Sequence, residues 1–215
     1  MHIEPGVLHA AKVLYANAAA GATLLAFAPK LLSGPETWAR TILAALFFSF
    51  FMEVFHLPVG VSELHFIGAS AVYLTFGLVP TLFGFALGLL LQGLLFEPQD
   101  LVHLGVNSLS LILPLLLAHV TLGRRFFRKN GWRLCWSQVV RFDALYYSGV
   151  VAMVGFWIAL GEEPAPLRQW GIFALSYLPV VLCEPLLTCL VLRWLKGFST
   201  RPLLGRLTCV PGLSL

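Results

Sequence analysis

The chain has 215 residues, of which 59% are hydrophobic and only 11% are charged. A soluble domain carries about a quarter of its residues as charged side chains, so this composition excludes an ordinary soluble fold. The net charge of +4 does not indicate a nucleic-acid partner, because the basic residues lie in short stretches between long apolar runs, as in the loops of membrane proteins. We expect a single integral membrane domain over residues 1–215, embedded in a lipid bilayer.

The predicted elements are transmembrane helices, each of which needs about 20 apolar residues to cross the hydrocarbon core. Apolar runs of helical length lie at 7–29, 39–57, 66–79, 81–96, 101–122, 139–160 and 169–195. The sequence therefore predicts an all-α polytopic transmembrane bundle with seven spans. Six spans are possible, because the third and fourth runs are short and could form one long helix bent near Pro80.

Charge in the loops predicts the orientation, since Lys and Arg collect on the cytoplasmic side of a membrane. With seven spans, most of the bases share one side, including those of a basic cytoplasmic loop at 123–138 and those after the last span. Most of the loop acids then share the other side. We expect the N-terminus outside and the C-terminus inside. Residues 1–30 fit a secretory signal poorly, because Glu4 and no base precedes the apolar run, so we expect the mature chain to begin Met1-His2.

The first span is crowded with small residues at i,i+4 spacing, which lets helices approach closely. These pairs are Ala16 and Ala20, Asn17 and Gly21, and Ala18 and Ala22. They could pack inside this bundle, which we favour, or dock against another membrane subunit.

Several metal-competent groups share the outer side in this topology. They are the amine of Met1, His2, His9, Glu53, His56, Glu63 and His65. The Met1 amine with the amide and imidazole nitrogens of His2 could offer three nitrogens to one ion, and His65 is the best candidate for a fourth. Square-planar nitrogen coordination favours Ni²⁺ or Cu²⁺. His65 closes the segment 57–65, whose proline and glycine suit a re-entrant loop. Alternatively, His2 is accidental and His65 is only hydrogen-bonded at the interface.

Three segments resemble one family, the CbiM/NikM-type metal-binding membrane subunits of energy-coupling-factor cobalt and nickel importers. Residues 1–6, Met-His-Ile-Glu-Pro-Gly, are similar to the family's opening Met-His-Ile-x-x-Gly. Residues 58–68 resemble its Pro- and Gly-rich loop closed by Thr-Ser-x-His-x-x-Gly, with Glu63 in place of a small hydroxyl residue. Residues 92–96 and 104–107 are similar to its Gln-x-Leu-x-Phe and Gly-x-Asn.

The resemblance implies that Met1 and His2 supply three nitrogens to the metal and His65 the fourth. It implies that residues 1–6 form a strand-like segment that inserts into an outward cavity and caps the metal, and that 57–65 is the outer ligand loop. The transported substrate would be Ni²⁺ or Co²⁺, which the sequence does not distinguish. The resemblance also implies a bacterial inner (plasma) membrane and import driven by a separate transmembrane coupling subunit and cytoplasmic ATPase subunits.

Other polar residues could support the site. Glu63 either accepts a hydrogen bond from His65 or is solvated at the surface, which we favour slightly. Glu53 and His56 lie at i,i+3 near the end of the second span, where they could face one another, and either tie the 57–65 loop or lie on the metal route. Asn107 is expected to hydrogen-bond across helices or to the loop.

Two further groups of polar residues have less definite expectations. Glu97, Asp100 and His103 mark the start of an interfacial helix or form an acidic patch. Glu184, beside Pro185, could satisfy a helix kink or contact a partner. The four cysteines form no CxxC pair and are expected to be structural.

The sequence contains no phosphate-binding Gly-x-x-x-x-Gly-Lys-Ser/Thr loop, so we expect this chain not to bind ATP. It has neither a defensible Ser-His-Asp arrangement nor an HExxH motif, so we expect no enzyme activity. Two alternatives remain open. One is a self-sufficient secondary permease for a metal or another cation, and the other is a membrane enzyme that uses Glu53, His56 and His65 as acids and bases.

Overall fold

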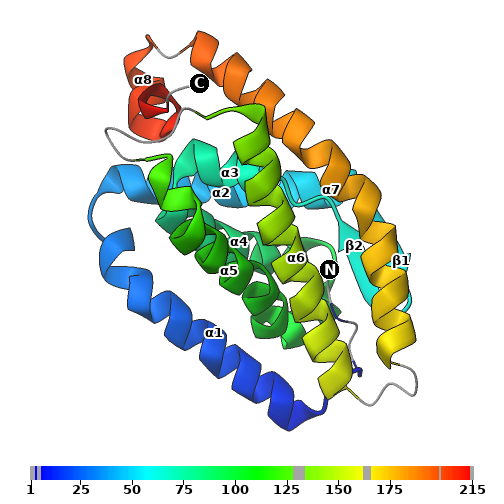
Figure 1. Cartoon of the computed structure of the whole chain (residues 1–215). Helices are drawn as coiled ribbons and strands as arrows, with labels where there is room; N and C mark the ends of the chain where they lie inside the picture. Colours follow the sequence, from blue (N-terminus) through cyan, green and yellow to red (C-terminus); the bar gives the residue numbers. More distant parts are fainter. Residues whose placement is uncertain (1–2, 4–5, 128–133, 162–165, 199, 214–215) are drawn as a thin grey trace.

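The computed structural model describes residues 3, 6–127, 134–161, 166–198 and 200–213. Within these ranges the fold is mainly helical (Figure 1). The α-helices are α1 (Ala10–Leu31), α2 (Pro35–Val54), α3 (Ala69–Phe76), α4 (Leu78–Leu95), α5 (Leu104–Thr121), α6 (Trp136–Leu160), α7 (Pro166–Gly197) and α8 (Pro202–Leu207). The remaining elements are the strands β1 (His56–Val59) and β2 (Ser62–His65) and the 3-10 helices η1 (Pro98–His103), η2 (Gly123–Arg125) and η3 (Val210–Gly212).

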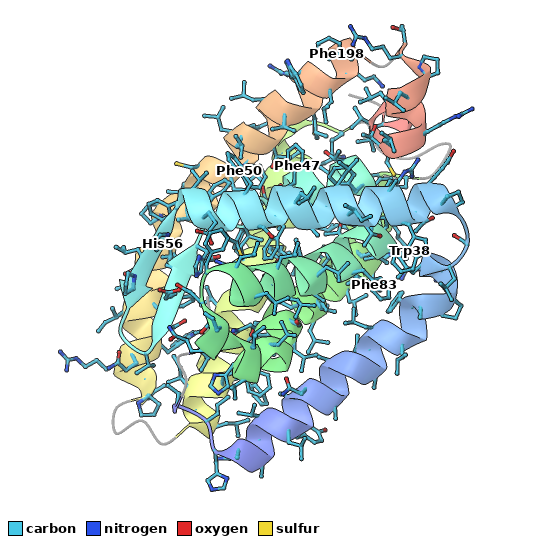
Figure 2. The ribbon with its side chains drawn as sticks, turned by 180° about the vertical axis from the view of Figure 1, so that it is seen from behind. Trp38, Phe47, Phe50, His56, Phe83 and Phe198 are labelled. Carbon is cyan, nitrogen blue, oxygen red and sulfur yellow. The ribbon has the colours of Figure 1, made fainter. Side chains whose placement is uncertain are left out.

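Six segments of the described chain are helical, long and apolar enough to cross a membrane: α1, α2, α4, η1 with α5, α6 and α7. Their surfaces suit lipid, since large apolar side chains such as Tyr15 on α1 and Leu182 on α7 are about three-quarters exposed. Figure 2 shows Phe47 and Phe50, also exposed, along α2. These features confirm a multi-pass membrane protein.

The run expected at 66–79 contains the helix α3, which has 8 residues, and the first two residues of α4. At 1.5 Å per residue, α3 is about 12 Å long, well short of a hydrocarbon core of about 30 Å. The chain breaks at Gly77, whose φ is 86°, and not at Pro80, because Pro80 lies in the first turn of α4, where proline is tolerated. The structure thus contains six described helices long enough to span a membrane. The seven-span count and the orientation of the N-terminus stay predictions.

Small residues bring the helices of the bundle close together. Gly84 of α4 faces Ala44 of α2 so closely that a Cβ atom at Gly84 would lie 2.7 Å from the Cβ of Ala44. On α1, Ala16 and Ala20 are buried, so this pair packs inside the bundle as favoured. Ala18 and Ala22 are exposed. The first span therefore has one small-residue face inside the bundle and one outside it.

Segment 57–65, expected to be a re-entrant loop, is largely a two-stranded antiparallel hairpin, so the fold is not all-α. His56 pairs with His65 and Val59 pairs with Ser62, which leaves Gly60 and Val61 as the turn. Gly60 has φ of 64°, a value that two-residue hairpin turns with glycine in the first central position require. The hairpin lies beside α7 (Figure 1).

All four cysteines are free thiols, and Cys135 and Cys183 are exposed. Cys135 has a structural role at the start of α6, where its backbone N–H donates to Oε1 of Gln138 over 3.4 Å in a capping box. Cys209 is partly buried in the segment after α8, where its backbone N–H donates to the carbonyl of Thr75 over 2.7 Å.

Candidate metal centre

The buried main chain of Ile3 lies against the hairpin. Ile3 is 0% exposed and forms an antiparallel bridge with Ser62. Its N–H donates to Oδ1 of Asn107 over 3.1 Å, and its carbonyl accepts from Nδ1 of His103 over 2.9 Å. Ile3 is therefore held between the edge of β2 and the start of α5.

The partner of the Asn107 side chain is therefore the backbone of Ile3, whereas the sequence predicted a partner on another helix or in the 57–65 loop. Sequence reasoning missed the contact of His103 with Ile3, since it expected His103 only at the start of an interfacial helix or in an acidic patch. The signal was available, because His103 and Asn107 are four residues apart and such residues share one face of a helix. The proposed ligands Met1 and His2 lie outside the described residues, as does most of segment 1–6.

His65 ends β2 and is 1% exposed. Its Nε2 lies 3.0 Å from Oε2 of Glu63, and its Nδ1 lies 3.4 Å from the carbonyl oxygen of Met52. Its own carbonyl accepts a hydrogen bond of 3.2 Å from the hydroxyl of Tyr177. The imidazole and the backbone of His65 are therefore positioned by contacts from the hairpin, α2 and α7.

The surface-solvated alternative for Glu63 is wrong. The side chain of Glu63 is 14% exposed, and its carboxylate pairs with the imidazole of His65. A carboxylate that accepts a hydrogen bond from an imidazole fixes the ring orientation and makes the ring a stronger electron donor. Glu63 therefore orients the imidazole of His65.

Glu53 and His56, expected to face one another, make their described contacts elsewhere. Oε1 of Glu53 accepts a hydrogen bond of 3.0 Å from Nε2 of the buried Gln92. His56 is exposed on β1 (Figure 2), with its ring centroid 6.3 Å from that of His65. Glu53 thus ties α2 to α4, whereas His56 lies on the hairpin beside His65.

Four carboxylates gather around this region. Burial raises the pKa of Glu97 to about 7, with further contributions from the negative charges of Glu63, Asp100 and Glu53 and from a hydrogen bond to Asp100. These acids come from α2, the hairpin, the α4–η1 connection and η1. Their combined field attracts cations. The sequence contains all four residues, but only the tertiary structure brings them together.

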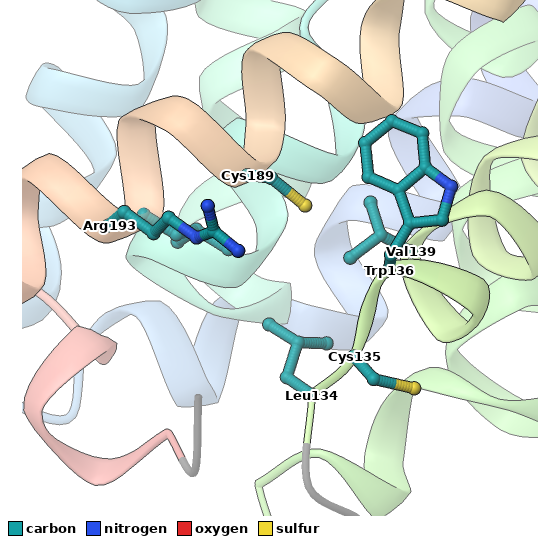
Figure 3. A pocket seen from close by; sticks show the side chains of 7 residues that line it. Leu134, Cys135, Trp136, Val139, Cys189 and Arg193 are labelled. Carbon is teal, nitrogen blue, oxygen red and sulfur yellow. The ribbon is translucent and has the colours of Figure 1, made fainter.

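The described residues do not by themselves complete a metal site, since no three His, Cys, Asp or Glu side chains among them could hold an ion. A separate pocket of about 360 Å³ lies between the start of α6 and α7 (Figure 3). Its lining includes Cys135, Cys189 and Arg193. The guanidinium of Arg193 would repel a metal cation. At a rise of 1.5 Å per residue, Cys189 lies about 18 Å along α7 from Tyr177, the residue that contacts His65. This pocket is therefore not part of the centre around His65.

Comparisons with known proteins identify the family and the fold of this chain. The family model described as "Cobalt uptake substrate-specific transmembrane region" matches residues 2–202. A protein of Haemophilus influenzae described as "Putative metal transport protein" is 24% identical over 190 residues, which cover 87% of this chain and 89% of the relative.

Two solved structures share the fold. A crystal structure of a transition metal transporter, 20% identical, superposes with a TM-score of 0.75 over 95% of this chain and 96% of its own. A truncated transition metal transporter, 19% identical, gives a TM-score of 0.75 over 92% and 99%. The family consists of transporter components, which sets aside the acid–base enzyme. The chain therefore belongs to the CbiM family of cobalt uptake substrate-specific transmembrane regions.

Proposed function

We propose that this chain captures Ni²⁺ or Co²⁺ for import at a site of four nitrogens, supplied by the amine of Met1, the amide and imidazole of His2, and the imidazole of His65. The observation that supports this site is the anchoring of Ile3. Its main chain is buried beside Ser62, on the strand that ends in His65. Consecutive Cα atoms are about 3.8 Å apart, so the anchor gives the two preceding residues a short reach to His65.

The donor set determines the chemistry of capture. Nitrogen ligands in one plane suit Ni²⁺ and compete poorly for Mg²⁺ or Ca²⁺, which prefer oxygen. Glu63, 3.0 Å from Nε2 of His65, would support the imidazole without itself binding the ion. The amine and the amide would have to lose protons to bind, so affinity should rise with pH.

The acidic groups around the site would act before capture. Glu53 and Glu97 with Asp100 would raise the local concentration of hydrated cations, and His56 lies exposed beside His65. We propose that these groups form the approach route, so that their loss slows metal entry more than it weakens final binding.

Import requires an energy source that this chain does not contain in any recognised motif. We propose that a transmembrane coupling subunit and cytoplasmic ATPase subunits supply it, in a bacterial plasma membrane with the N-terminus of this chain outside. The exposed small residues Ala18 and Ala22 on α1 offer a surface for close helix contact with the coupling subunit. Metal uptake by this chain alone, without ATPase partners, would favour the secondary permease instead.

The decisive experiment is Ni²⁺ and Co²⁺ binding by the purified chain with its native terminus, measured by isothermal titration calorimetry. It is compared with a variant that carries one added N-terminal residue and with His65→Ala. Both changes should abolish stoichiometric binding, because each removes nitrogens from the set. His9→Ala is the matched control, since His9 is an exposed histidine just before α1. Equally tight binding by both altered proteins would refute the four-nitrogen site.

A further inference from the structure

Two carboxylic acids are buried in the middle of the bundle, away from the hydrogen bonds that hold Ile3. Asp143 on α6 and Glu184 on α7 are each 0% exposed. Neither forms an ion pair with a described Lys, Arg or His. An acid inside a membrane-spanning segment costs free energy and usually marks a function.

Glu184 is fully engaged by donors. Its Oε1 accepts from the backbone N–H of Ser70 over 3.3 Å, and its Oε2 accepts from the hydroxyl of Tyr147. Ser70 lies in the first turn of α3, where the unpaired N–H groups and the helix dipole suit an anion. This environment therefore suits Glu184 as an ionised carboxylate.

Asp143 has the opposite environment. Neither of its carboxyl oxygens has a hydrogen-bond partner of ordinary geometry, although the group lies near Glu184 and the hydroxyl of Ser70. That hydroxyl is 2.6 Å from the hydroxyl of Thr188. An ionised carboxylate with no donor, buried beside a second carboxylate, would be strongly destabilising.

The other titratable groups that face the pair do not compensate the charge. They are the phenols of Tyr146 and Tyr147 from α6 and of Tyr177 from α7, and the thiol of Cys189 near Asp143. Each of these groups is neutral when it holds its proton, and none can carry a positive charge. Two ionised carboxylates in this position would leave two uncompensated negative charges.

We propose that Asp143 and Glu184 form a proton-binding site inside the membrane domain, in which Asp143 holds one proton beside an ionised Glu184. Carboxyls that share a site cannot both ionise readily, and one of them keeps a proton. The protonated carboxyl of Asp143 then becomes a donor in a cluster of acceptors. The site is linked to the β1–β2 hairpin through α3 and α7. Glu184 accepts from the start of α3, and Tyr177, on the same helix as Glu184, donates to the carbonyl of His65.

Infrared spectroscopy of the metal-free protein at neutral pH tests this site without reference to nickel or cobalt. The wild-type chain should show the C=O stretch of a protonated carboxylic acid that exchanges slowly in D₂O because it is buried. Asp143→Asn should lose this band. Glu97→Gln is the control and should keep it, since Glu97 is only partly buried near the chain surface.

Absence of a slowly exchanging protonated carboxyl from the wild-type spectrum would overturn the proposal, and so would a band that persists in both Asp143→Asn and Glu184→Gln. If Asp143→Asn does not fold, the wild-type spectrum and Glu184→Gln decide the question, because loss of the ionised partner should shift or remove the band. A bound metal cation in place of the proton would leave no band in the wild type. The infrared result does not depend on metal binding. The proton site at Asp143 and Glu184 and the four-nitrogen metal site can therefore be refuted independently.

Discussion

Replacing Asn107 by Ala tests whether anchoring of the N-terminal segment supports metal capture. The change removes the Oδ1 that accepts the N–H of Ile3 over 3.1 Å. Ile3 is fully buried, so its N–H would have no access to water while the segment stays in place. A buried donor without an acceptor costs about 1–3 kcal/mol. If this penalty falls on the metal-bound state, the dissociation constant for Ni²⁺ should increase by about 5- to 150-fold.

The assay is calorimetric titration of the detergent-purified protein with a native terminus, together with its thermal unfolding. Asn107→Asp is the matched control, since it keeps an oxygen at the same position and should retain most of the affinity. The free energy of unfolding without metal should change less than the free energy of Ni²⁺ binding, because segment 1–6 can detach while the helices stay packed. Nickel binding by Asn107→Ala as tight as that of the wild type, in a protein with unchanged unfolding, would refute the anchor.

Three further outcomes are expected. Glu63→Gln should weaken Ni²⁺ binding by about 10- to 100-fold in a calorimetric titration, because the carboxylate that orients His65 is lost; an unchanged affinity contradicts this role. The pKa of Glu97 is raised from 4.5 to about 7, so the folded chain binds this proton more tightly than the unfolded chain, and stability should fall as pH rises between these values. Glu97→Gln should flatten that part of a thermal unfolding series, and an equal slope would contradict the assignment. Gly60→Ala should lower the melting temperature, because its φ of 64° is strained for alanine, whereas Gly171→Ala, with no positive φ and no neighbour within 4 Å, should not.

The sequence alone predicted most of the membrane architecture. The limits expected for the first span and for the last three agree with α1, α5, α6 and α7 to within a few residues. The reason is that the thickness of the hydrocarbon core imposes a length of apolar chain that can be read without knowing any neighbour. The sequence did not reveal that the third run contains the short, fully buried helix α3, because apolar character alone does not distinguish burial inside the protein from contact with lipid.

The sequence also singled out His65 as a candidate ligand, because it closes a segment that contains proline and glycine. Its environment could not. The hairpin depends on backbone pairing and a glycine turn, and Ile3 is held by residues about a hundred positions away. Asp143 drew no attention as an isolated acid, and its meeting with Glu184 depends on how α6 packs against α7. Local pattern determined which segments enter the membrane, whereas contacts between distant segments, which only the packed helices create, decided which polar groups meet inside it.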